Sequence, residues 1–323
     1  METTPRRRYG VNRWWILLFV VLGIIFSIIF PPVQPHILVA PERITHAPLF
    51  TLPFIGDFYL TNTLTTLIIV NVIVILLALA VRNSLARKTD LVPTGISGAM
   101  EALVEVLYNL TESTAGRWAK TIFPWFASIL IIVLISNWMG LIPGMEAVGT
   151  LEEVHAGEHG NHADFAGSVG LLKAEEGDYT IVPWFRGMST DLNFTFALAL
   201  ISVIATQIVG FRALGPGYLF RFFNVLTVFR RPFFGVMDFI VGLLELLSTL
   251  ALILSFAFRL FGNMFAGMVL LFLVASMAPV FAPSLVMTFE FFIGAIQAFV
   301  FGMLTLVFMA QATQGHGGGE EHH

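Results

Sequence analysis

Four residues carry the only formal charges between Pro232 and Gly319: Asp238, Glu245, Arg259 and Glu290. Arg259 stands 14 residues after the nearest preceding charge and 31 before the next one. An arginine at the centre of a membrane helix costs about 3 kcal/mol on insertion scales, whereas one near a helix end simply extends to the headgroups. The isolation of Arg259 therefore predicts that it meets a partner carboxylate or a water-filled cavity.

The chemistry of these side chains divides them into two kinds. A guanidinium has a pKa above about 12 and does not pass a proton on, whereas a carboxylate in a low-dielectric site can be tuned to bind and release one. Glu245 and Glu290 are therefore candidate relay groups, although each could instead be an internal hydrogen-bonding group. Arg259 is a fixed positive charge that blocks continuous ion flow and attracts a mobile carboxylate. This fits a machine whose ion carrier sits on a separate moving part.

Helical spacing places the earlier charges on one face. Asp238, Glu245 and Arg259 follow one another at intervals of 7 and 14 residues, which are close to whole numbers of helical turns. Asn263 adds one more turn to this stripe. Asp238 also lies close to two preceding arginines, so it is either part of an ion pathway or a plain interfacial residue.

A second polar line follows after a proline break. Glu290 and Gln297 are again 7 residues apart, so this line could face the first. A shallow groove beside Arg259, at which another helix could approach closely, is formed by the small residues Gly262, Ala266 and Gly267.

The elements that must position these residues are membrane helices. Hydrophobic residues make up 57% of the 323 residues and charged residues only 12%, which is the composition of an integral membrane protein. A bilayer core of about 30 Å needs roughly 20 apolar residues per crossing. Such segments are predicted at 14–30, 59–81, 122–143 and 193–211, followed by one apolar tract at about 233–312.

That late tract is too long for one upright crossing. Residues 234–277 contain no proline, and a helix of this length would be about twice as long as the bilayer is thick. The helix must either turn back near Gly262 and Gly267 or lie strongly tilted. Pro279 and Pro283 then break the chain, and a second helix of about 28 residues follows.

Charge asymmetry orients the predicted helices. Basic clusters precede the first and third spans and follow the second and fourth, so the positive-inside rule places all four clusters on the cytoplasmic side. The clusters are Arg6, Arg7, Arg8 and Arg13; Arg82, Arg87 and Lys88; Arg117 and Lys120; and Arg212, Arg221, Arg230 and Arg231. The connection 144–192 must then face outside, and it contains nine acidic residues but only Lys173 and Arg186 as basic ones.

Two segments allow alternative interpretations. The span 14–30 could be a signal peptide, but no small-x-small cleavage site follows it closely, which favours a retained helix. Residues 96–113 have apolar residues at helical spacing, with Glu101, Glu105 and Glu112 between them. This pattern is typical of a helix at the membrane interface and equally of an ordinary connecting helix.

Four separated stretches together resemble one known family. They are SNWMGLIPG (136–144), STDLNFTFALAL (189–200), SFAFRLFGNMFAG (255–267) and IGAIQAFVFGMLTLVFM (293–309). In this order, and over about residues 60 to 312, the chain resembles subunit a of the F-type ATP synthase membrane sector. The resemblance implies two long, steeply tilted C-terminal helices that pack on a rotor ring of c subunits. It also implies two offset aqueous half-channels that meet the ring on either side of the essential arginine.

The resemblance assigns roles around that arginine. Arg259 matches the essential arginine itself, Asn263 the asparagine one turn further on, and Gln297 the glutamine that faces it. These three residues, with Glu245 and Glu290, are the predicted site.

It also assigns positions along the two half-channels. Glu245 matches the acid of the cytoplasmic half-channel, and Asp191 and Asn193 match polar positions near the outer entrance. Glu290 falls where some members have His, and Met268 where some have Glu. The outer path of this chain is therefore either sparser or more dependent on water.

Other chemistry finds little support in the sequence. No GxxxxGK[ST] phosphate loop is present, so nucleotide chemistry belongs to partner subunits. His155, His159 and His162 in HAGEHGNH could hold Zn, but a solvated flexible loop is favoured in this Gly-rich context. No cofactor, metal or nucleic acid is expected, and the absence of cysteine excludes disulfides.

The sequence therefore predicts an all-α polytopic membrane protein with about six membrane helices. Its expected parts are an extra N-terminal membrane helix with an external segment (1–58), membrane helices with an interfacial connection (59–143), an acidic external loop (144–192), membrane helices with the ion-pathway hairpin (193–312), and a flexible tail (313–323). The common core of the family has no span like 14–30 and no outer loop as long as 145–188.

The predicted function is that of the stator subunit of a proton-translocating F-type ATP synthase. The expected partners are c-ring subunits, peripheral-stalk b subunits, the rest of the complex and the lipid bilayer. The expected location is a bacterial-type plasma membrane, with the C-terminus cytoplasmic. The alternative is a stand-alone secondary ion transporter, but the internal inverted repeat often seen in that class is not visible here. A purely structural scaffold would leave Arg259 replaceable.

Overall fold

The computed structural model describes residues 40–45, 47–53, 56–87, 95–153, 161–162, 178–221, 232–277 and 282–314, with scattered positions between 14 and 25. Most of the expected span 14–30 lies outside these residues. So do His155, His159 and the tail after residue 314, and with them the possible Zn site and the flexible tail.

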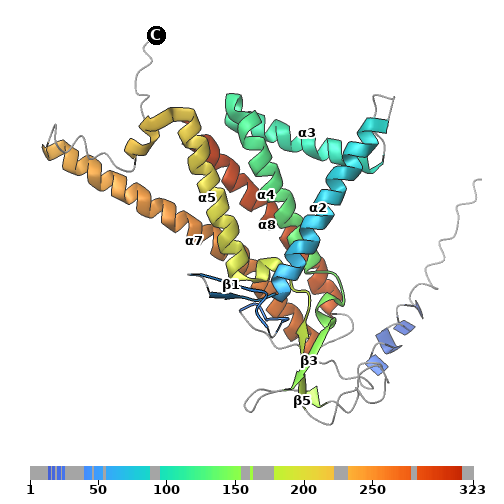
Figure 1. Cartoon of the computed structure of the whole chain (residues 1–323). Coiled ribbons are helices and arrows are strands. Elements are labelled where there is room, and N and C mark those ends of the chain that lie inside the picture. The colour runs from blue at the N-terminus through green and yellow to red at the C-terminus, as the bar shows by residue number, and fades with distance from the viewer. Residues whose placement is uncertain are drawn as a thin grey trace, which may run out of the picture.

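Six long helices make up most of the described chain (Figure 1). They are α2 (Asn62–Arg87), α3 (Ile96–Ala115), α4 (Ala119–Met139), α5 (Leu192–Leu214), α7 (Pro232–Met277) and α8 (Ala282–Ala312). Within the described residues, five stretches are long and apolar enough to cross a membrane: Asn62–Asn83, Gly98–Met139, Leu192–Tyr218, Phe239–Ala275 and Ala282–Ala312. The chain is thus a mostly helical, multi-pass membrane protein, as predicted.

Helix α7 decides between the two alternatives for the long apolar tract. It runs without interruption for 46 residues, so the chain does not turn back at Gly262 or Gly267. At 1.5 Å per residue the helix is about 70 Å long, more than twice the thickness of a bilayer core. Figure 1 shows α7 crossing α5 obliquely, with its first part extending well beyond the other helices. A helix of this length fits a membrane only when it is strongly tilted.

The core lies where α4, α5, α7 and α8 meet. Phe256 of α7 packs on Phe301 of α8 with 5.1 Å between ring centroids, and both are buried together with Val133 of α4 and Val203 of α5. Gly302 permits α8 to approach α4 closely, because a Cβ at this position would lie 3.1 Å from Cβ of Leu130. The core therefore holds α8 firmly between its neighbours.

Helix α3 lies across the bundle rather than along it. In Figure 1 it runs between the far end of α2 and the start of α4, across the direction of both. Leu107 of α3 is buried in a cluster with α4, α5 and α8, whereas Glu101, Glu105 and Glu112 are exposed. This is the orientation that the interfacial interpretation of residues 96–113 requires.

Short strands lie at the end of the bundle opposite α3 (Figure 1). The hairpin of β1 (Phe50–Leu52) and β2 (Gly56–Phe58) precedes α2. In the acidic connection, β5 (Asp178–Pro183) pairs antiparallel with both β3 (Gly149–Glu153) and β4 (Asn161–His162). The sequence favoured a flexible loop around 155–162, but β4 pairs the end of that stretch with β5. The β-branched residues of DYTIVP fit a strand.

Candidate functional site

Arg259 lies on the outer face of α7. Phe256, Leu260 and Met264 of this helix are buried against the core, whereas Arg259 and Asn263 are exposed. Among the described residues, no hydrogen bond or ion pair holds the Arg259 guanidinium group. The charge that the sequence singles out is therefore presented outward by this chain and is not neutralised within its described part.

A hydrogen bond joins the two predicted polar lines beside Arg259. Nδ2 of Asn263 donates to Oε1 of Gln297 at 2.8 Å, so the structure brings these two residues together across α7 and α8. Gln297 is buried, and its Nε2 has no hydrogen-bond partner in the described structure. An unpaired buried donor costs about 1–3 kcal/mol, so a water or a group from another chain is expected to accept from it.

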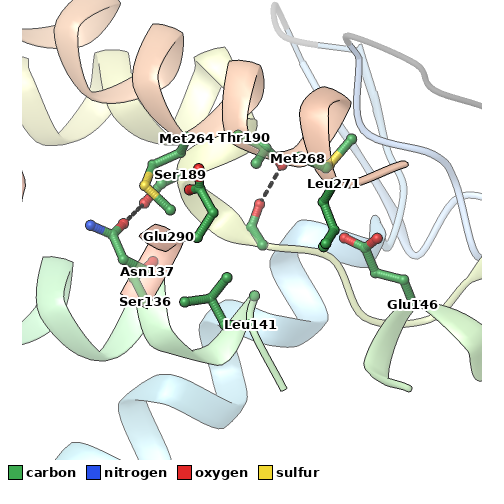
Figure 2. Close-up of a pocket in the computed structure, with 13 residues that line it drawn as sticks. Ser136, Asn137, Leu141, Glu146, Ser189, Thr190, Met264, Met268, Leu271 and Glu290 are labelled. Carbon is green, nitrogen blue, oxygen red and sulfur yellow. Dashed lines mark hydrogen bonds between the residues drawn. The ribbon is translucent and has the colours of Figure 1, made fainter. Parts of the chain in front are cut away.

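Glu290 occupies a cavity between α8, α7 and the loop after α4 (Figure 2). The side chain is only 5% exposed, and the cavity has a volume of about 40 Å³. Gly267 of α7 gives room to the carboxyl group, because a Cβ at this position would overlap it. Gly267 thus makes room for a side chain of α8 in the same chain. A Cβ at Gly262 would instead meet open space, and Gly262 lies on the exposed face near Arg259.

A polar network holds α8 in place beside this cavity. Nδ2 of Asn137 donates to the carbonyl oxygen of Gly294 at 2.9 Å, and Oγ of Ser189 donates to Oδ1 of Asn137 at 2.5 Å (Figure 2). Ser189 belongs to the short helix η4 (Met188–Thr190). Trp138 stacks on Phe291, with 4.6 Å between ring centroids. The motif 136–144 therefore positions the segment of α8 that carries Glu290.

Glu245 lines a second cavity, of about 300 Å³, between α5, α7 and α8. Its polar lining includes Gln207 and Tyr218, the latter in the helix η5 (Gly215–Arg221), and the hydroxyl of Tyr218 donates to Oε1 of Gln207 at 2.7 Å. Gly210 makes this possible, because a Cβ there would lie 2.7 Å from the tyrosine ring. Sequence reasoning missed Gln207 and Tyr218, which no motif singles out.

The two cavities lie toward opposite ends of α8. Glu290 lines one and Gln311 the other, and these positions are 21 residues apart on the helix, or about 30 Å. Along α7, Arg259 stands between Glu245 of the second cavity and Met268 of the first. The arrangement therefore consists of two separate polar cavities with an exposed, fixed cation between them.

Asp191 and Asn193 lie in a different place from Glu290. Asp191 caps α5 by accepting from the backbone N–H of Asn193 at 2.8 Å, and it accepts from Oγ1 of Thr63 at 2.8 Å. Asp191 is 4% exposed and, with Asn193 and Arg43, borders a third cavity of about 450 Å³. The structure does not place Asp191 in the cavity of Glu290. The side chain of Asp238 lies outside the described part.

Two further ionisable residues near β3 and β5 were not singled out by sequence reasoning. Glu146, in the helix η2 (Met145–Ala147), lines the cavity of Glu290. Burial raises the pKa of Glu146 to about 7; the charge of Arg186 acts in the opposite direction, and Glu42 raises the pKa further. Arg186 is buried, and desolvation lowers its pKa despite the carboxylates near it. Their sequence signal was only membership of the acidic connection.

These features define a class of membrane protein: a multi-pass helical subunit with two polar cavities on opposite sides of a lone arginine. Comparison with known families identifies the one concerned. Residues 63–310 match the family described as ATP synthase A chain. Because this match covers most of the chain, the protein belongs to that family.

Individual relatives agree with this assignment. The chain is 29% identical over 284 residues to ATP synthase subunit a of Mycobacterium bovis, covering 84% of this chain and 94% of that protein. It is 28% identical over 301 residues to ATP synthase subunit a of Acidothermus cellulolyticus, covering 90% of each. A sodium ion specific ATP synthase subunit a from Propionigenium modestum is 29% identical over 225 residues, covering 69% of this chain and 65% of that one.

Proposed function

We propose that this chain is the stator subunit of an F-type ATP synthase and couples ion flow to rotation of a c-ring. One observation carries the proposal: an exposed arginine stands along α7 between two separate cavities, each of which is lined by a glutamate. The ion is a proton in this proposal, because each cavity offers a carboxyl group, Glu290 on one side and Glu245 on the other. Membership of the ATP synthase A chain family does not favour the alternative, a stand-alone secondary ion transporter.

The surface around Arg259 supports a rotor partner. Exposed apolar side chains lie on both long helices, among them Leu254 and Phe258 of α7 and Phe292 and Ile296 of α8. An apolar surface with a single cation fits a ring of membrane helices in which each subunit carries one carboxylate. Such a carboxylate would neutralise Arg259 and could accept from the unpaired Nε2 of Gln297.

The coupling then follows from the charges. A proton that reaches the cavity of Glu290 passes to a rotor carboxylate, and the neutral carboxyl group can move into the lipid. After rotation the proton leaves through the cavity of Glu245, and the ionised carboxylate returns to Arg259. Because a guanidinium does not release its proton at physiological pH, Arg259 prevents protons from passing directly between the two cavities.

The proposed orientation follows from the distribution of charge over the fold. Three helix ends are close in sequence to the basic clusters: the ends of α2 and α5 and the start of α4. They are at the α3 end of the bundle, whereas the strands of the acidic connection are at the other end (Figure 1). By the positive-inside rule the α3 end is cytoplasmic. We accordingly place the chain in a bacterial-type plasma membrane with its C-terminus in the cytoplasm, beside peripheral-stalk b subunits.

Substitution of Arg259 tests this function in vesicles that carry the whole complex. Arg259→Lys keeps the charge but loses the planar fork and can deprotonate, so ion-driven ATP synthesis should fall to background while the extrinsic sector still hydrolyses ATP. Arg259→Ala also removes the barrier, so passive proton flux should rise. The free energy that the membrane potential supplies is about 2.3 kcal/mol per charge per 100 mV. ATP synthesis and passive flux are measured together.

Arg212 supplies the matched control. It is an exposed arginine in the last turn of α5, outside both cavities, so Arg212→Lys and Arg212→Ala should leave synthesis close to the wild-type rate. Wild-type synthesis in both Arg259 variants would refute the proposal. Ion transport by the isolated chain, without a small acid-bearing hairpin protein that co-purifies with it, would favour the transporter instead.

A further inference from the structure

We propose that Glu146 exchanges protons between the outer medium and Glu290, and that Arg186 is the residue that positions Glu146 for this exchange. The inference rests on the proposed function and adds to it an acid from the loop after α4. It assigns the outer part of the proton route to residues of the external connection, whereas Glu290 receives the proton within the membrane helices.

The shared cavity is the first support. Glu146 and Glu290 line the same cavity, with Met268 and Leu271 of α7 between them in Figure 2. Among the described residues, they are the only carboxylates in its lining, and none of the other described lining residues exchanges protons readily near neutral pH. A proton that crosses this cavity can therefore bind in turn to these two carboxyl groups.

The difference in exposure decides which of the two carboxyl groups the proton meets first. Glu146 is partly exposed and lies outside the membrane-spanning helices, near β3 and β5. Glu290 is 5% exposed and lies within α8. Glu146 therefore meets the outer medium first, and Glu290 is reached only through the cavity.

The size of the cavity suits proton transfer through water. Its volume is about 40 Å³. Because one water needs about 10–15 Å³ of such volume, the cavity has room for roughly three waters. The hydroxyls of Ser136 and Ser189 and the amide of Asn137 in its lining offer these waters hydrogen-bond partners. A proton can thus pass from the carboxyl group of Glu146 through water to the carboxylate of Glu290, leaving Glu146 ionised and ready to bind another.

The charges around Glu146 suit repeated binding and release near neutral pH. Burial brings its pKa to about 7, the guanidinium of Arg186 limits this rise, and Glu42 adds to it. Glu290 of α8 is the other titratable group that faces it across the cavity. A carboxyl group with this pKa both accepts and donates protons at the pH of the medium, which an ordinary glutamate does poorly.

Arg186 is held rigidly beside Glu146. Its side chain is 5% exposed; Nε donates to Oγ1 of Thr190 at 3.2 Å and Nη1 to the carbonyl oxygen of Ala40 at 3.1 Å. Its backbone N–H donates to Oγ1 of Thr66 at 3.1 Å. These bonds fix the guanidinium relative to α2, η4 and the N-terminal segment. Arg186 can therefore set the pKa and the place of Glu146 without touching the rotor.

The test follows ATP synthesis by the whole complex in vesicles that contain the outer loop in their lumen. The lumenal pH is varied from about 5 to about 8, while a K⁺/valinomycin potential keeps the total driving force constant. The wild type should show an inflection near the pKa of Glu146. Glu146→Gln should lower the rate several-fold and remove the inflection, whereas Glu146→Asp should retain it. Arg186→Gln should move the inflection to higher pH, and Arg186→Lys should restore it.

Two controls distinguish a failure of this inference from a failure of the proposed function. Glu105→Gln changes an exposed acid of α3 that is not in the cavity lining, so its pH profile should match the wild type. Arg259→Lys in the same vesicles reports on the proposed function. If Arg259→Lys abolishes synthesis but Glu146→Gln keeps the wild-type rate and profile, the role of Glu146 is refuted and the proposed function stands. A fall in rate for Arg186→Gln without a shift of the inflection would refute the positioning role.

Discussion

At the scale of single residues, Gly267 determines where the carboxyl group of Glu290 lies. A side chain at this position would overlap that carboxyl group, so the absence of a Cβ on α7 creates the space in which α8 places its acid. Gly267 and Glu290 both line the same cavity. The sequence suggested a groove of small residues for an approaching helix, and for Gly267 that helix is α8 of the same chain.

Gly267→Ala should therefore displace the carboxyl group of Glu290 and reduce ion-driven ATP synthesis several-fold. The overlapping atoms are at the flexible end of the side chain, so assembly and thermal stability should change little. The double substitution Gly267→Ala with Glu290→Asp should recover part of the activity, because the shorter acid needs less room. Synthesis rates and complex yield of the wild type and these two variants check this. Equal loss in the single and double variants would argue against a steric cause.

At the scale of elements, Asp191 joins the start of α5 to the start of α2. It caps α5 through the backbone N–H of Asn193 and accepts a hydrogen bond from Thr63 of α2. Both bonds lie at the end of the bundle opposite α3, where η4 also contributes Ser189 to the network around Asn137. A role near the outer entrance stays a prediction for Asp191, whereas its part in holding α2 against α5 follows from these contacts.

Asp191→Ala should destabilise the chain, because it removes an N-cap and leaves the Thr63 hydroxyl without its acceptor. Each loss costs about 1 kcal/mol, so the melting temperature of the full chain in detergent should fall by a few degrees. Asp191→Asn keeps an acceptor at the cap and should fall less. Thr63→Val tests the bridge to α2 alone. A melting temperature unchanged by Asp191→Ala would contradict this structural role.

At the scale of the whole molecule, the described charged side chains lie at the two ends of the bundle or line a cavity, apart from Arg259. Apolar side chains predominate on the outward faces of α7 and α8, and Arg259 is the charged residue among the described side chains there. At the end opposite α3, Glu146, Arg186 and Glu42 interact electrostatically although they come from separate segments of the chain. The stability of that end should consequently depend on pH.

The direction of this dependence follows from Glu146. Its pKa is raised from 4.5 to about 7, so the folded chain binds more protons than the unfolded one between these values, and stability falls as pH rises through that window. Glu146→Gln removes this titration. The melting temperature of Glu146→Gln minus that of the wild type should therefore increase from about pH 5 to about pH 7 and then level off. A difference that stays constant with pH would contradict the raised pKa.

The sequence by itself determined the membrane class and the approximate helix positions, and it singled out Arg259 as an isolated charge whose role stays a prediction. These properties are local: apolar length sets a span, proline ends a helix, and an isolated charge in an apolar run is evident without neighbours. The long proline-free tract likewise predicted a helix too long to stand upright, but not whether it turned back. Only the structure showed that α7 continues past Gly262 and Gly267.

Tertiary structure decided which polar groups share a cavity. Glu146 and Glu290 are 144 positions apart in the sequence, and no periodicity relates residues on different segments. Gln207 and Tyr218 join Glu245 for the same reason, through the packing of α5 and η5 against α7. The facing of Asn263 and Gln297 was implied by resemblance, and the crossing of α7 and α8 sets their hydrogen bond. Helical spacing assigns residues to faces, but the packing of side chains between helices determines which faces meet.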